Sequence, residues 1–376
     1  MHEPTIRSRT WAEINLGALK HNLGIAKATG KKVMCVIKAD AYGHGAVACG
    51  RFLEENGADA FAVACLSEAL ELRRAGIELP ILILGYTPAQ YADSLAAYAI
   101  TQTVVDEQSA IEMNNAAKQA GVTVEVHIKL DTGMSRTGIM CQGEAFYDSA
   151  ACCAERICEL GNLNVTGMYT HLAAADSPEE IEYTQWQIDS FTAVRDRLES
   201  RGITPAICHA SNSAAIMNNP NAHFDMVREG IMLYGLYPDS IPRVTGPLMP
   251  VMTLKSRVAQ IREFPEGTTV SYGRTYRAKT PIKCAVISAG YADGYPRRLS
   301  NRSHIKIGGV SYPQIGRVCM DVIMADITGG SVQRGDEVVL FGAKGMSLEE
   351  VAQEVGTINY EIACLVTCRA KRVYIE

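Results

Sequence analysis

The chain has 376 residues, of which 47% are hydrophobic and 20% are charged, a balance typical of a globular protein with room for two domains. Its net charge of −5 at pH 7 gives no electrostatic reason to expect a nucleic-acid partner. The amino end lacks a basic stretch before an apolar core, and no apolar run is long enough to span a bilayer, so we expect neither a signal peptide nor a membrane segment.

The twelve cysteines are spaced neither for a disulfide framework nor for zinc. They form no C-x-x-C pair, and no cysteine and histidine cluster has ligand spacing, so we expect no metal. Several, such as Cys35 and Cys284, lie inside apolar strand-like runs, where a reduced thiol packs as a small hydrophobe. This usage indicates the reducing cytoplasm.

Eight short β-branched runs alternate with amphipathic helical stretches, of which residues 66–74 and 106–112 are the clearest. This alternation predicts a parallel sheet covered by helices, and eight units match a closed (β/α)₈ TIM barrel in an α/β fold. A doubly wound open sheet is the alternative, but it usually carries a longer glycine fingerprint than Gly43–Gly45. The predicted strands are Val33–Ile37, Phe61–Ala64, Ile81–Leu84, Ile100–Val105, Val124–Leu130, Val165–Thr170, Ala206–His209 and Met226–Arg228.

The pattern changes near Pro242–Pro250, after which short strand-like runs are separated by turn residues. These runs predict a mostly antiparallel β-domain with one serine-capped helix over Ser347–Val355. The predicted strands are Leu254–Ile261, Thr268–Tyr272, Ile282–Ser288, His304–Ile307, Val318–Asp321, Glu337–Phe341 and Arg369–Tyr374.

We therefore place the barrel at residues 11–243 and the β-domain at residues 244–376. The extreme amino end, residues 1–10 or the wider segment Arg7–Asn15, is predicted to pair with the β-domain.

Lys38 is the most informative single residue, because it ends the first predicted strand and opens a loop. In an α/β barrel the chemistry lies at the carboxyl ends of the strands. Loss of solvation there favours the neutral amine, which forms Schiff bases with aldehydes, pyridoxal phosphate among them. The alternative is a lysine that extends from the strand end into water.

Side chains suited to catalysis or anion binding follow five of the eight predicted strands. Because the carboxyl ends of the strands meet at one rim, we expect these side chains to converge there. They are Lys38 after the first strand, Arg136 after the fifth, His171 after the sixth, Asn212 and Ser213 after the seventh, and Arg228, Gly230 and Ile231 at the eighth.

The loops after strands seven and eight often bind phosphate in this fold. Ser213 at a predicted helix start and the backbone amides of Gly230 and Ile231 would stabilise a phosphate dianion. Ser213 is equally well explained as a helix N-cap. His171, taken alone, is better explained as a hydrogen-bonded core imidazole. His209 is expected to lie behind the site.

Five motifs follow one another along the chain: VIKADAYGHG at Val36–Gly45, KLDTGMSR at Lys129–Arg136, SYG at Ser271–Gly273, GYADG at Gly290–Gly294 and GRVCMD at Gly316–Asp321. With them the chain resembles the alanine racemase family, the barrel group of pyridoxal phosphate enzymes, over nearly its whole length. The order and spacing of five motifs make the resemblance highly specific, although the first is shared loosely with other barrel pyridoxal enzymes. Ser135 stands where glycine is common in the family, a mild departure.

The resemblance implies pyridoxal 5′-phosphate as the cofactor. Lys38 matches the Schiff-base lysine, His171 the imidazole near the ring, and Arg228 the partner of the pyridine nitrogen. Arg136 matches the arginine that contacts the cofactor's phenolic oxygen and the substrate carboxylate. The phosphate is matched by Tyr42, Ser213, Gly230, Ile231 and Tyr360, with Leu84 and Asn212 as further cofactor contacts.

Inverting a stereocentre requires one proton to leave from one face and another to arrive on the opposite face. The resemblance implies that Lys38 serves one face and Tyr272 of the partner subunit serves the other. It also implies that Met320 and Asp321 of the partner subunit lie at the substrate carboxylate and that Tyr291 gates the substrate channel. The expected unit is therefore a homodimer with shared active sites and a small amino-acid substrate.

Lys129 in the fifth predicted strand carries a separate expectation. Its alternation with Val126 and Ile128 predicts an inward direction. In relatives this lysine can be carbamylated, and the anionic side chain would then pair with Arg136.

The favoured interpretation is a bacterial cytoplasmic enzyme that interconverts L- and D-alanine and supplies D-alanine for peptidoglycan. The close alternative is a serine or dual racemase, the catalytic part of a vancomycin-resistance enzyme whose membrane domain would precede Met1. Asparagine tends to replace Tyr360 in that group, so Tyr360 favours alanine. A barrel decarboxylase would place an acid where Arg228 stands, and a pyridoxal phosphate carrier would lack the β-domain with Tyr272.

Overall fold

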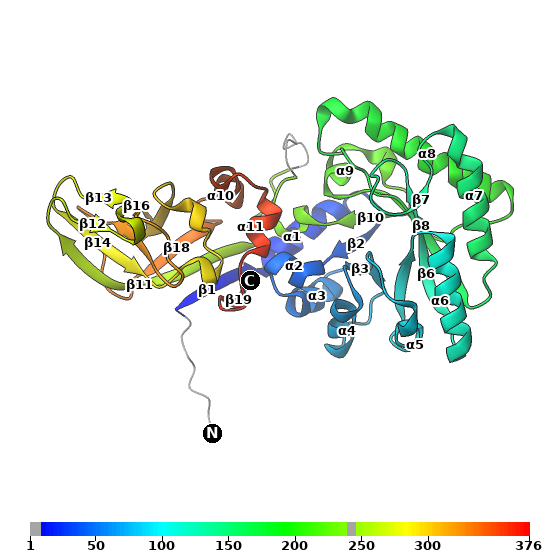
Figure 1. The fold of residues 1–376 in the computed structure, drawn as a ribbon, viewed down its shortest axis with the longest axis horizontal. Helices are drawn as coiled ribbons and strands as arrows, with labels where there is room; N and C mark the ends of the chain where they lie inside the picture. The colour runs from blue at the N-terminus through cyan, green and yellow to red at the C-terminus, as the bar shows by residue number, and fades with distance from the viewer. Residues whose placement is uncertain (1–8, 239–245) are drawn as a thin grey trace, which may run out of the picture.

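The alternating strands and helices form a parallel barrel at one end of an elongated molecule, and the second domain lies at the other end (Figure 1). The computed structural model describes residues 9–238 and 246–376. The predicted boundary at residue 243 and residues 1–8 lie outside the described residues.

Eight parallel strands form the barrel wall, in the order β10-β2-β3-β4-β5-β6-β8-β9. The wall closes where the amide of Asp225 donates to the carbonyl of Cys208 at 3.1 Å and that of Arg228 to Ser211 at 3.1 Å. The strands are β2 (Lys32–Val36), β3 (Ala60–Val63), β4 (Ile81–Ile83), β5 (Ile100–Val104), β6 (Val124–Asp131), β8 (Leu163–Tyr169), β9 (Cys208–His209) and β10 (Met226–Glu229), with a short β7 (Ile139–Met140) beside β6. All eight predicted barrel strands are confirmed.

Helices cover the outside of the barrel, which explains why its strands are apolar on both faces. Helix α6 shows how the sequence sets an end: Asp106 accepts from the amide of Ser109 at 2.7 Å, and Gly121 terminates the helix at φ 68°. The barrel helices are α1 (Leu16–Lys27), α2 (Lys38–Gly43), α3 (Ala46–Glu55), α4 (Leu66–Arg74), α5 (Ala92–Ala97), α6 (Glu107–Ala120), α7 (Glu144–Cys158), α8 (Ile181–Ser200) and α9 (Ser213–Asn218).

The β-domain is built on strands that close on themselves in the order β14-β17-β16-β15-β18-β11, because β14 also pairs with β11. Strand β1 (Thr10–Asn15) continues this sheet beside β11, and β19 pairs with β1 in parallel. The remaining elements are β11 (Met252–Phe264), β12 (Thr269–Val270), β13 (Tyr276–Arg277), β14 (Ile282–Ile287), β15 (His304–Ile307), β16 (Val310–Ile315), β17 (Ile323–Asp326), β18 (Glu337–Gly342), α10 (Leu348–Val355), α11 (Asn359–Cys364) and β19 (Lys371–Ile375).

One strand prediction in this domain, Val318–Asp321, is wrong, and another, Thr268–Tyr272, is confirmed only over the shorter strand β12. Residues 318–321 form a loop, because the carbonyls of Cys319 and Met320 accept from the neighbouring turn at Tyr291–Asp293 instead of from a strand. Tyr272 lies in a 3₁₀ turn after β12, because Ser271 adopts the left-handed φ of 66° and ends the strand. Strands β13, β16 and β17 and helix α11 were not predicted.

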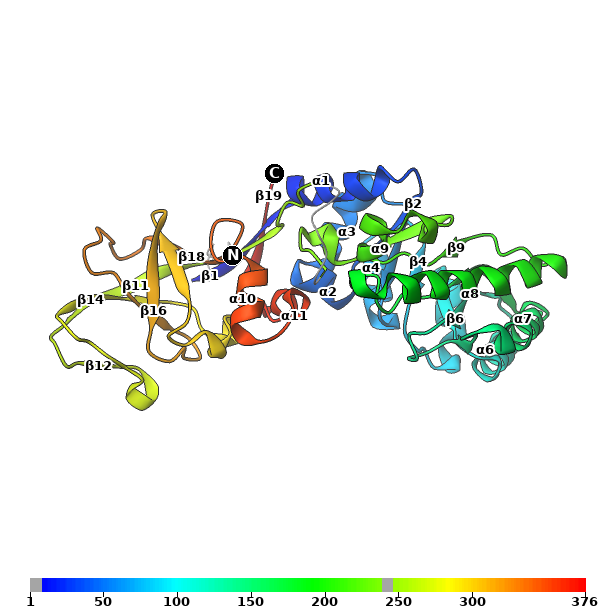
Figure 2. The ribbon, with the colours of Figure 1, turned by 90° about the horizontal axis from the view of Figure 1, so that it is seen from above.

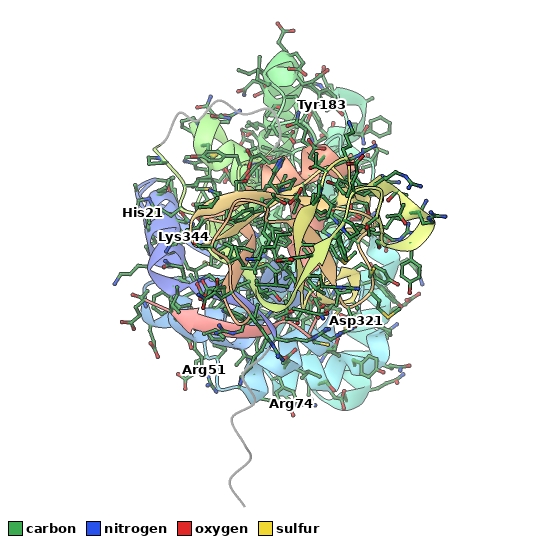
Figure 3. The ribbon with its side chains drawn as sticks, turned by 90° about the vertical axis from the view of Figure 1, so that its left-hand side faces the viewer. His21, Arg51, Arg74, Tyr183, Asp321 and Lys344 are labelled. Atoms are coloured by element: carbon green, nitrogen blue, oxygen red, sulfur yellow. The ribbon has the colours of Figure 1, made fainter. Side chains whose placement is uncertain are left out.

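The two ends of the molecule are well separated. The pair β12–β13 lies at the end of the β-domain remote from the barrel in both views (Figure 2). Seen along the long axis, the β-domain with Asp321 stands in front of the barrel, whose α4 and α8 carry Arg74 and Tyr183 at the periphery (Figure 3). Helix α11, in contrast, lies against α2 at the barrel mouth.

Candidate active site

The carboxyl ends of the barrel strands surround a cavity of about 460 Å³. Its lining includes every barrel residue predicted for the site, together with Tyr360 from α11. These residues are Lys38, Tyr42, Leu84, Lys129, Arg136, His171, Asn212, Ser213, Arg228, Gly230, Ile231 and Tyr360.

Lys38 stands where β2 gives way to an unusual turn. The next four residues, 39–42, have φ values between 52° and 54°, so α2 is a left-handed turn. It holds Lys38 at the cavity and places Tyr42 in the same wall. Burial, aided by the positive charge of Arg136, lowers the pKa of Lys38 from its ordinary value. The shift is in the direction expected for a nucleophilic amine.

One corner of the cavity gathers hydroxyl and amide groups. Asn212 is the N-cap of α9, and its side chain accepts from the amide of Ala215 at 3.0 Å. Ser213 is thus not the cap: its Oγ accepts from the amides of Gly230 at 3.0 Å and Met232 at 3.3 Å. The amide of Gly230, expected to be exposed, therefore has an acceptor within the chain.

The backbone of Gly230 lies close to two hydroxyl groups. A Cβ atom at this position would lie 3.4 Å from Ser213 Oγ and 3.5 Å from the hydroxyl of Tyr42. Two hydroxyls thus converge over a bare backbone, a cradle suited to the oxygens of an anion.

Arg228 on β10 is buried beneath the cavity floor, only 3% exposed. Its guanidinium donates to the carbonyls of Thr170 at 2.8 Å and Ala210 at 3.0 Å, and to Nδ1 of His171 at 3.1 Å. A further bond of 2.8 Å reaches Nδ1 of His209. Burial lowers the pKa of Arg228 to about 10, which still leaves it charged at neutral pH.

Three imidazoles near Arg228 are neutral. Burial and the charge of Arg228 lower the pKa of His127 to about 4 and hold the pKa values of His171 and His209 well below the ordinary value. Because Arg228 donates to Nδ1 of His209, the proton of His209 lies on Nε2, 3.0 Å from Nδ1 of His127. His209 thus lies behind the site, as expected, and orients Arg228.

The loop after β6 is folded around Asp131, whose carboxylate accepts from the amides of Gly133 at 3.1 Å and Ser135 at 2.9 Å. Ser135 has a φ of 54°, a conformation that glycine adopts without strain, which explains why glycine suits this position. The loop delivers Arg136 to the cavity.

Lys129 on β6 points into the cavity, where its ammonium donates to Oγ1 of Thr137 at 2.6 Å. Burial, with the charges of Arg136 and Arg228, lowers the pKa of Lys129 to about 8. The cavity therefore concentrates basic side chains.

Several lining residues escaped the sequence analysis, chiefly Tyr169, Thr137 and Asp176. Tyr169 is 2% exposed, stacks on His209 at 4.8 Å and lies beneath Arg228 at 5.2 Å. The signal that could have found Tyr169 is the two-residue period of β8, which puts it on the same inward face as His171.

Four predicted residues lie in the β-domain and are absent from the lining of this chain's cavity: Tyr272, Tyr291, Met320 and Asp321. Their side chains are largely presented to the outside, and Tyr272, Met320 and Tyr291 are 71%, 51% and 40% exposed. Tyr272 follows β12, which lies at the end remote from the barrel (Figure 2).

Within residues 9–238 and 246–376, no group of three or more histidine, cysteine or acidic side chains is arranged to hold a metal ion. The helices of those same ranges include none that is both long and apolar enough to cross a bilayer. All twelve cysteines are described and are free thiols.

Both domains of the chain match known proteins. Residues 14–238 match the family model for the alanine racemase N-terminal domain, and residues 251–374 match that for the C-terminal domain. A relative from Desulforamulus reducens, named alanine racemase, is 45% identical over 371 residues, covering 97% of this chain and 98% of the relative.

Solved structures agree. An alanine racemase of Clostridium difficile 630 has a TM-score of 0.93 at 40% identity and covers 99% of this chain and 97% of its own. A Bartonella henselae alanine racemase with covalently bound pyridoxal phosphate has a TM-score of 0.86 at 28% identity and covers 98% of this chain and all of its own. With both domains matched in order and a full-length relative at this identity, the chain belongs to the alanine racemase family.

Proposed function

We propose that this protein is a pyridoxal phosphate-dependent racemase that interconverts L- and D-alanine. The observation that carries the proposal is one cavity at the barrel mouth that unites Lys38, Arg136 and Arg228, in a chain that matches both domains of the family. Full-length relatives that carry the name alanine racemase support the same substrate.

The cavity fits pyridoxal 5′-phosphate. The cradle of Ser213, Tyr42 and Gly230 suits the phosphate, with Ile231 and Tyr360 beside it and Leu84 and Asn212 in the same wall. Lys38, with its lowered pKa, suits covalent attachment through its amine. When bound, the cofactor supplies an aldehyde for that attachment and a conjugated ring that withdraws electrons from the substrate's Cα.

Arg228 would face the ring nitrogen and direct the reaction. Because its pKa stays near 10, it donates a hydrogen bond and does not protonate that nitrogen. A carboxylate in its place would hold a protonated ring nitrogen, which is a stronger electron sink. Arg228 would therefore limit how far electrons are drawn from the substrate into the ring, which would disfavour transamination. A hydrogen bond holds His171 beside Arg228.

Two residues would exchange protons with the substrate's Cα, one on each face: Lys38 and Tyr272 of the partner subunit. Arg136 would hold the substrate carboxylate together with Met320 and Asp321 of the partner subunit, and the partner's Tyr291 would gate the channel. This arrangement requires a homodimer. The exposure of Tyr272, Met320 and Tyr291, at a distance from their own chain's cavity, supports it.

We also propose that Lys129 is carbamylated. Its pKa near 8 makes a neutral amine accessible for reaction with carbon dioxide, and the resulting anion would offset the charge of Arg136. Isotope-labelled bicarbonate should give a carbamate carbon signal by NMR, which Lys129→Gln abolishes. Absence of that signal in the wild-type protein would contradict the modification.

The free thiols, several of them buried, support a location in a reducing cytoplasm, where D-alanine would be supplied for peptidoglycan.

The experiment that tests the function measures racemisation by the pyridoxal phosphate-loaded protein, with kcat/KM for L-alanine and L-serine compared in parallel. We expect a strong preference for alanine, because Tyr360, which is bulkier than asparagine, lines the cavity. Comparable turnover of serine would assign the protein to the serine or dual racemases, and turnover of neither would overturn the proposal.

A further inference from the structure

Two exposed loops of the β-domain are joined into one unit. In the turn Tyr291–Asp293, the amide of Tyr291 donates to the carbonyl of Cys319 at 3.1 Å. The amide of Ala292 donates to the carbonyl of Met320, also at 3.1 Å. A Cβ atom on Gly290 would lie 2.3 Å from each of those two carbonyl oxygens. Only glycine permits this approach, so the loops that carry Tyr291 and Met320 cannot move independently.

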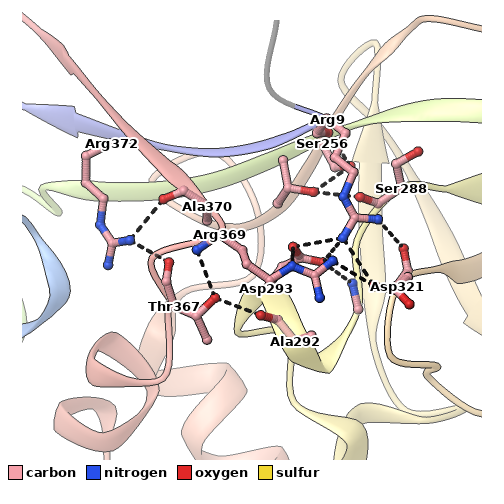
Figure 4. Close-up of polar contacts among 12 residues, drawn as sticks. Arg9, Ser256, Ser288, Ala292, Asp293, Asp321, Thr367, Arg369, Ala370 and Arg372 are labelled. Atoms are coloured by element: carbon pink, nitrogen blue, oxygen red, sulfur yellow. Dashed lines mark hydrogen bonds and ion pairs between the residues drawn. The ribbon is translucent and has the colours of Figure 1, made fainter. Parts of the chain in front are cut away.

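Asp293 lies at the centre of this unit and is fully buried. Its Oδ2 accepts from the amide of Gly290 at 3.0 Å, which closes the turn. Both carboxylate oxygens accept from Arg9 at 3.2 Å, and Nε of Arg369 lies 3.4 Å from Oδ1 (Figure 4).

The same two arginines hold the second loop. Arg9 donates to the carbonyl of Asp321 at 3.1 Å, and Arg369 donates to its carboxylate at 2.7 Å. The side chains of Arg9, Arg369 and Asp321 are 41%, 40% and 53% exposed, so water screens their mutual attraction. The carboxylate of Asp293 is the one buried charge in this group, so water cannot take the place of its arginine partners.

Hydrogen bonds connect these two loops to the mouth of the chain's own barrel. Thr367 donates its hydroxyl to the carbonyl of Ala292 at 2.7 Å. Arg372 donates to the carbonyl of Thr367 at 2.6 Å (Figure 4). It also donates to the carbonyl of Gly43, in the turn after Lys38, at 2.9 Å. The segment from Thr367 to Arg372 therefore connects the two loops to the barrel mouth.

We propose that Asp293 is a positioning residue that fixes Tyr291 and Met320 in the orientation in which they reach the partner's cavity. This inference rests on the proposed function, in which those side chains act in the partner subunit's site. Asp293 itself touches no substrate. Its ion pairs support loops whose side chains are exposed, so their order serves a surface that meets another molecule rather than the core.

The first test is Asp293→Asn, which keeps the shape and an acceptor for the amide of Gly290 but removes the charge. Because Met320 and Tyr291 act in binding and access, we expect KM for alanine to rise by about tenfold while kcat changes by less than about threefold. The matched control is Asp336→Asn: Asp336 also accepts a backbone amide, that of Gln333 at 2.8 Å, but its carboxylate has no arginine partner among the described residues. Wild-type kinetics are expected for the control.

If Asp293→Asn does not fold, Arg369→Gln provides the second variant, because Arg9 still pairs with Asp293. We expect a smaller rise in KM in the same direction. An unchanged KM in a folded Asp293→Asn enzyme, or a loss confined to kcat, would overturn the proposal.

Mixed dimers decide in which site Asp293 acts. In the first dimer, one chain carries Lys38→Ala and Asp293→Asn and its partner is wild type, so the single active barrel receives loops from the altered chain. In the second, one chain carries Lys38→Ala and the other Asp293→Asn, so the active barrel receives intact loops. We expect a raised KM in the first dimer and a wild-type KM in the second.

The reverse pattern would show that Asp293 acts within its own chain and would overturn the proposal. The same two dimers built with Tyr272→Phe in place of Asp293→Asn test the shared site itself. If Tyr272→Phe also acts within its own chain, it is the proposed dimeric function that fails. If only Tyr272 acts across the dimer, the inference about Asp293 alone is wrong.

Discussion

Burial sets the charge of the individual side chains around the cavity. Lys38 loses solvation and its pKa falls, so the neutral amine becomes available, whereas Arg228 remains charged although its pKa falls to about 10. The pKa of His171 falls well below its ordinary value, so its ring stays neutral beside Arg228. The cavity thus combines a nucleophile with fixed positive charge, which suits a phosphorylated cofactor and a carboxylate substrate.

Glu229, beside Arg228 on β10, is a residue whose burial disfavours the folded state. It is fully buried, and neither carboxyl oxygen has a hydrogen-bond partner among the described residues. Burial raises the pKa of Glu229 well above its ordinary value. The folded chain therefore keeps a proton that the unfolded chain releases above about pH 4.3, so Glu229 costs stability as pH rises through neutrality.

We predict that Glu229→Met stabilises the fold by about 1–4 kcal/mol at pH 7, and by less at pH 5, where the linked proton costs less. Urea unfolding at the two pH values measures this. Glu354→Met on the exposed side of α10 is the control and should have little effect at either pH. A gain for Glu229→Met that is equal at both pH values would show that proton linkage is not its cause.

At the scale of elements, the left-handed turn α2 shows how a costly backbone is retained. Each left-handed residue costs about 1–2 kcal/mol. Hydrogen bonds offset this cost: the amide of Gly45 donates to the carbonyl of Asp40 at 2.9 Å, and that of Ala46 to its carboxylate at 2.7 Å. The amide of Ala39, an exposed residue, donates to the carboxylate of Glu68 at 2.8 Å. The turn thus holds Lys38 and Tyr42 in one wall.

An alanine-to-glycine change should cost less stability in this turn than in an ordinary helix. At Ala39, with φ 52°, glycine relieves strain of about 1 kcal/mol and loses a similar amount to the entropy of the unfolded chain, so we predict a net change within about 0.5 kcal/mol. At Ala116 inside α6, the same change should destabilise by about 1 kcal/mol. Thermal unfolding of both variants measures this, and an equal loss at both positions would contradict it.

At the scale of the whole molecule, the elongated shape separates the cavity from four exposed side chains of the β-domain that the family motifs predict for the active site. These are Tyr272, Tyr291, Met320 and Asp321. Tyr360 comes from the second domain yet lines the chain's own cavity, whereas Tyr272 follows β12 at the remote end. The cavity of a single chain is thus lined by the groups that fit the cofactor but not by Tyr272, the proposed second acid or base.

We therefore predict that dilution into monomers abolishes racemisation but leaves the cofactor bound. Activity per chain should follow the dimer fraction measured by sedimentation, while the absorbance of the bound cofactor falls much less. Activity per chain that stays constant as the dimer dissociates would show that one chain suffices.

Local patterns were sufficient for much of this structure. The apolar runs and the amphipathic stretches between them predict all eight barrel strands, because a parallel sheet covered by helices is buried on both faces. They fail at residues 318–321, where the backbone pairs with a distant turn, and at α11, which is too short for a helical period to emerge. Tyr169 was also overlooked, because its role depends on stacking against His209 of another strand.

By itself, the sequence determined the class of fold, the place of Lys38, Arg136 and Arg228 at strand ends, and the family motifs, because these depend on periodicity and spacing along the chain. Only the tertiary structure decided that the hydroxyl of Ser213 accepts hydrogen bonds from the amides of Gly230 and Met232. The same is true of the ion pairs that Arg9 and Arg369 form with Asp293. Such contacts join segments far apart in the sequence, and their geometry depends on how whole elements pack rather than on any local pattern.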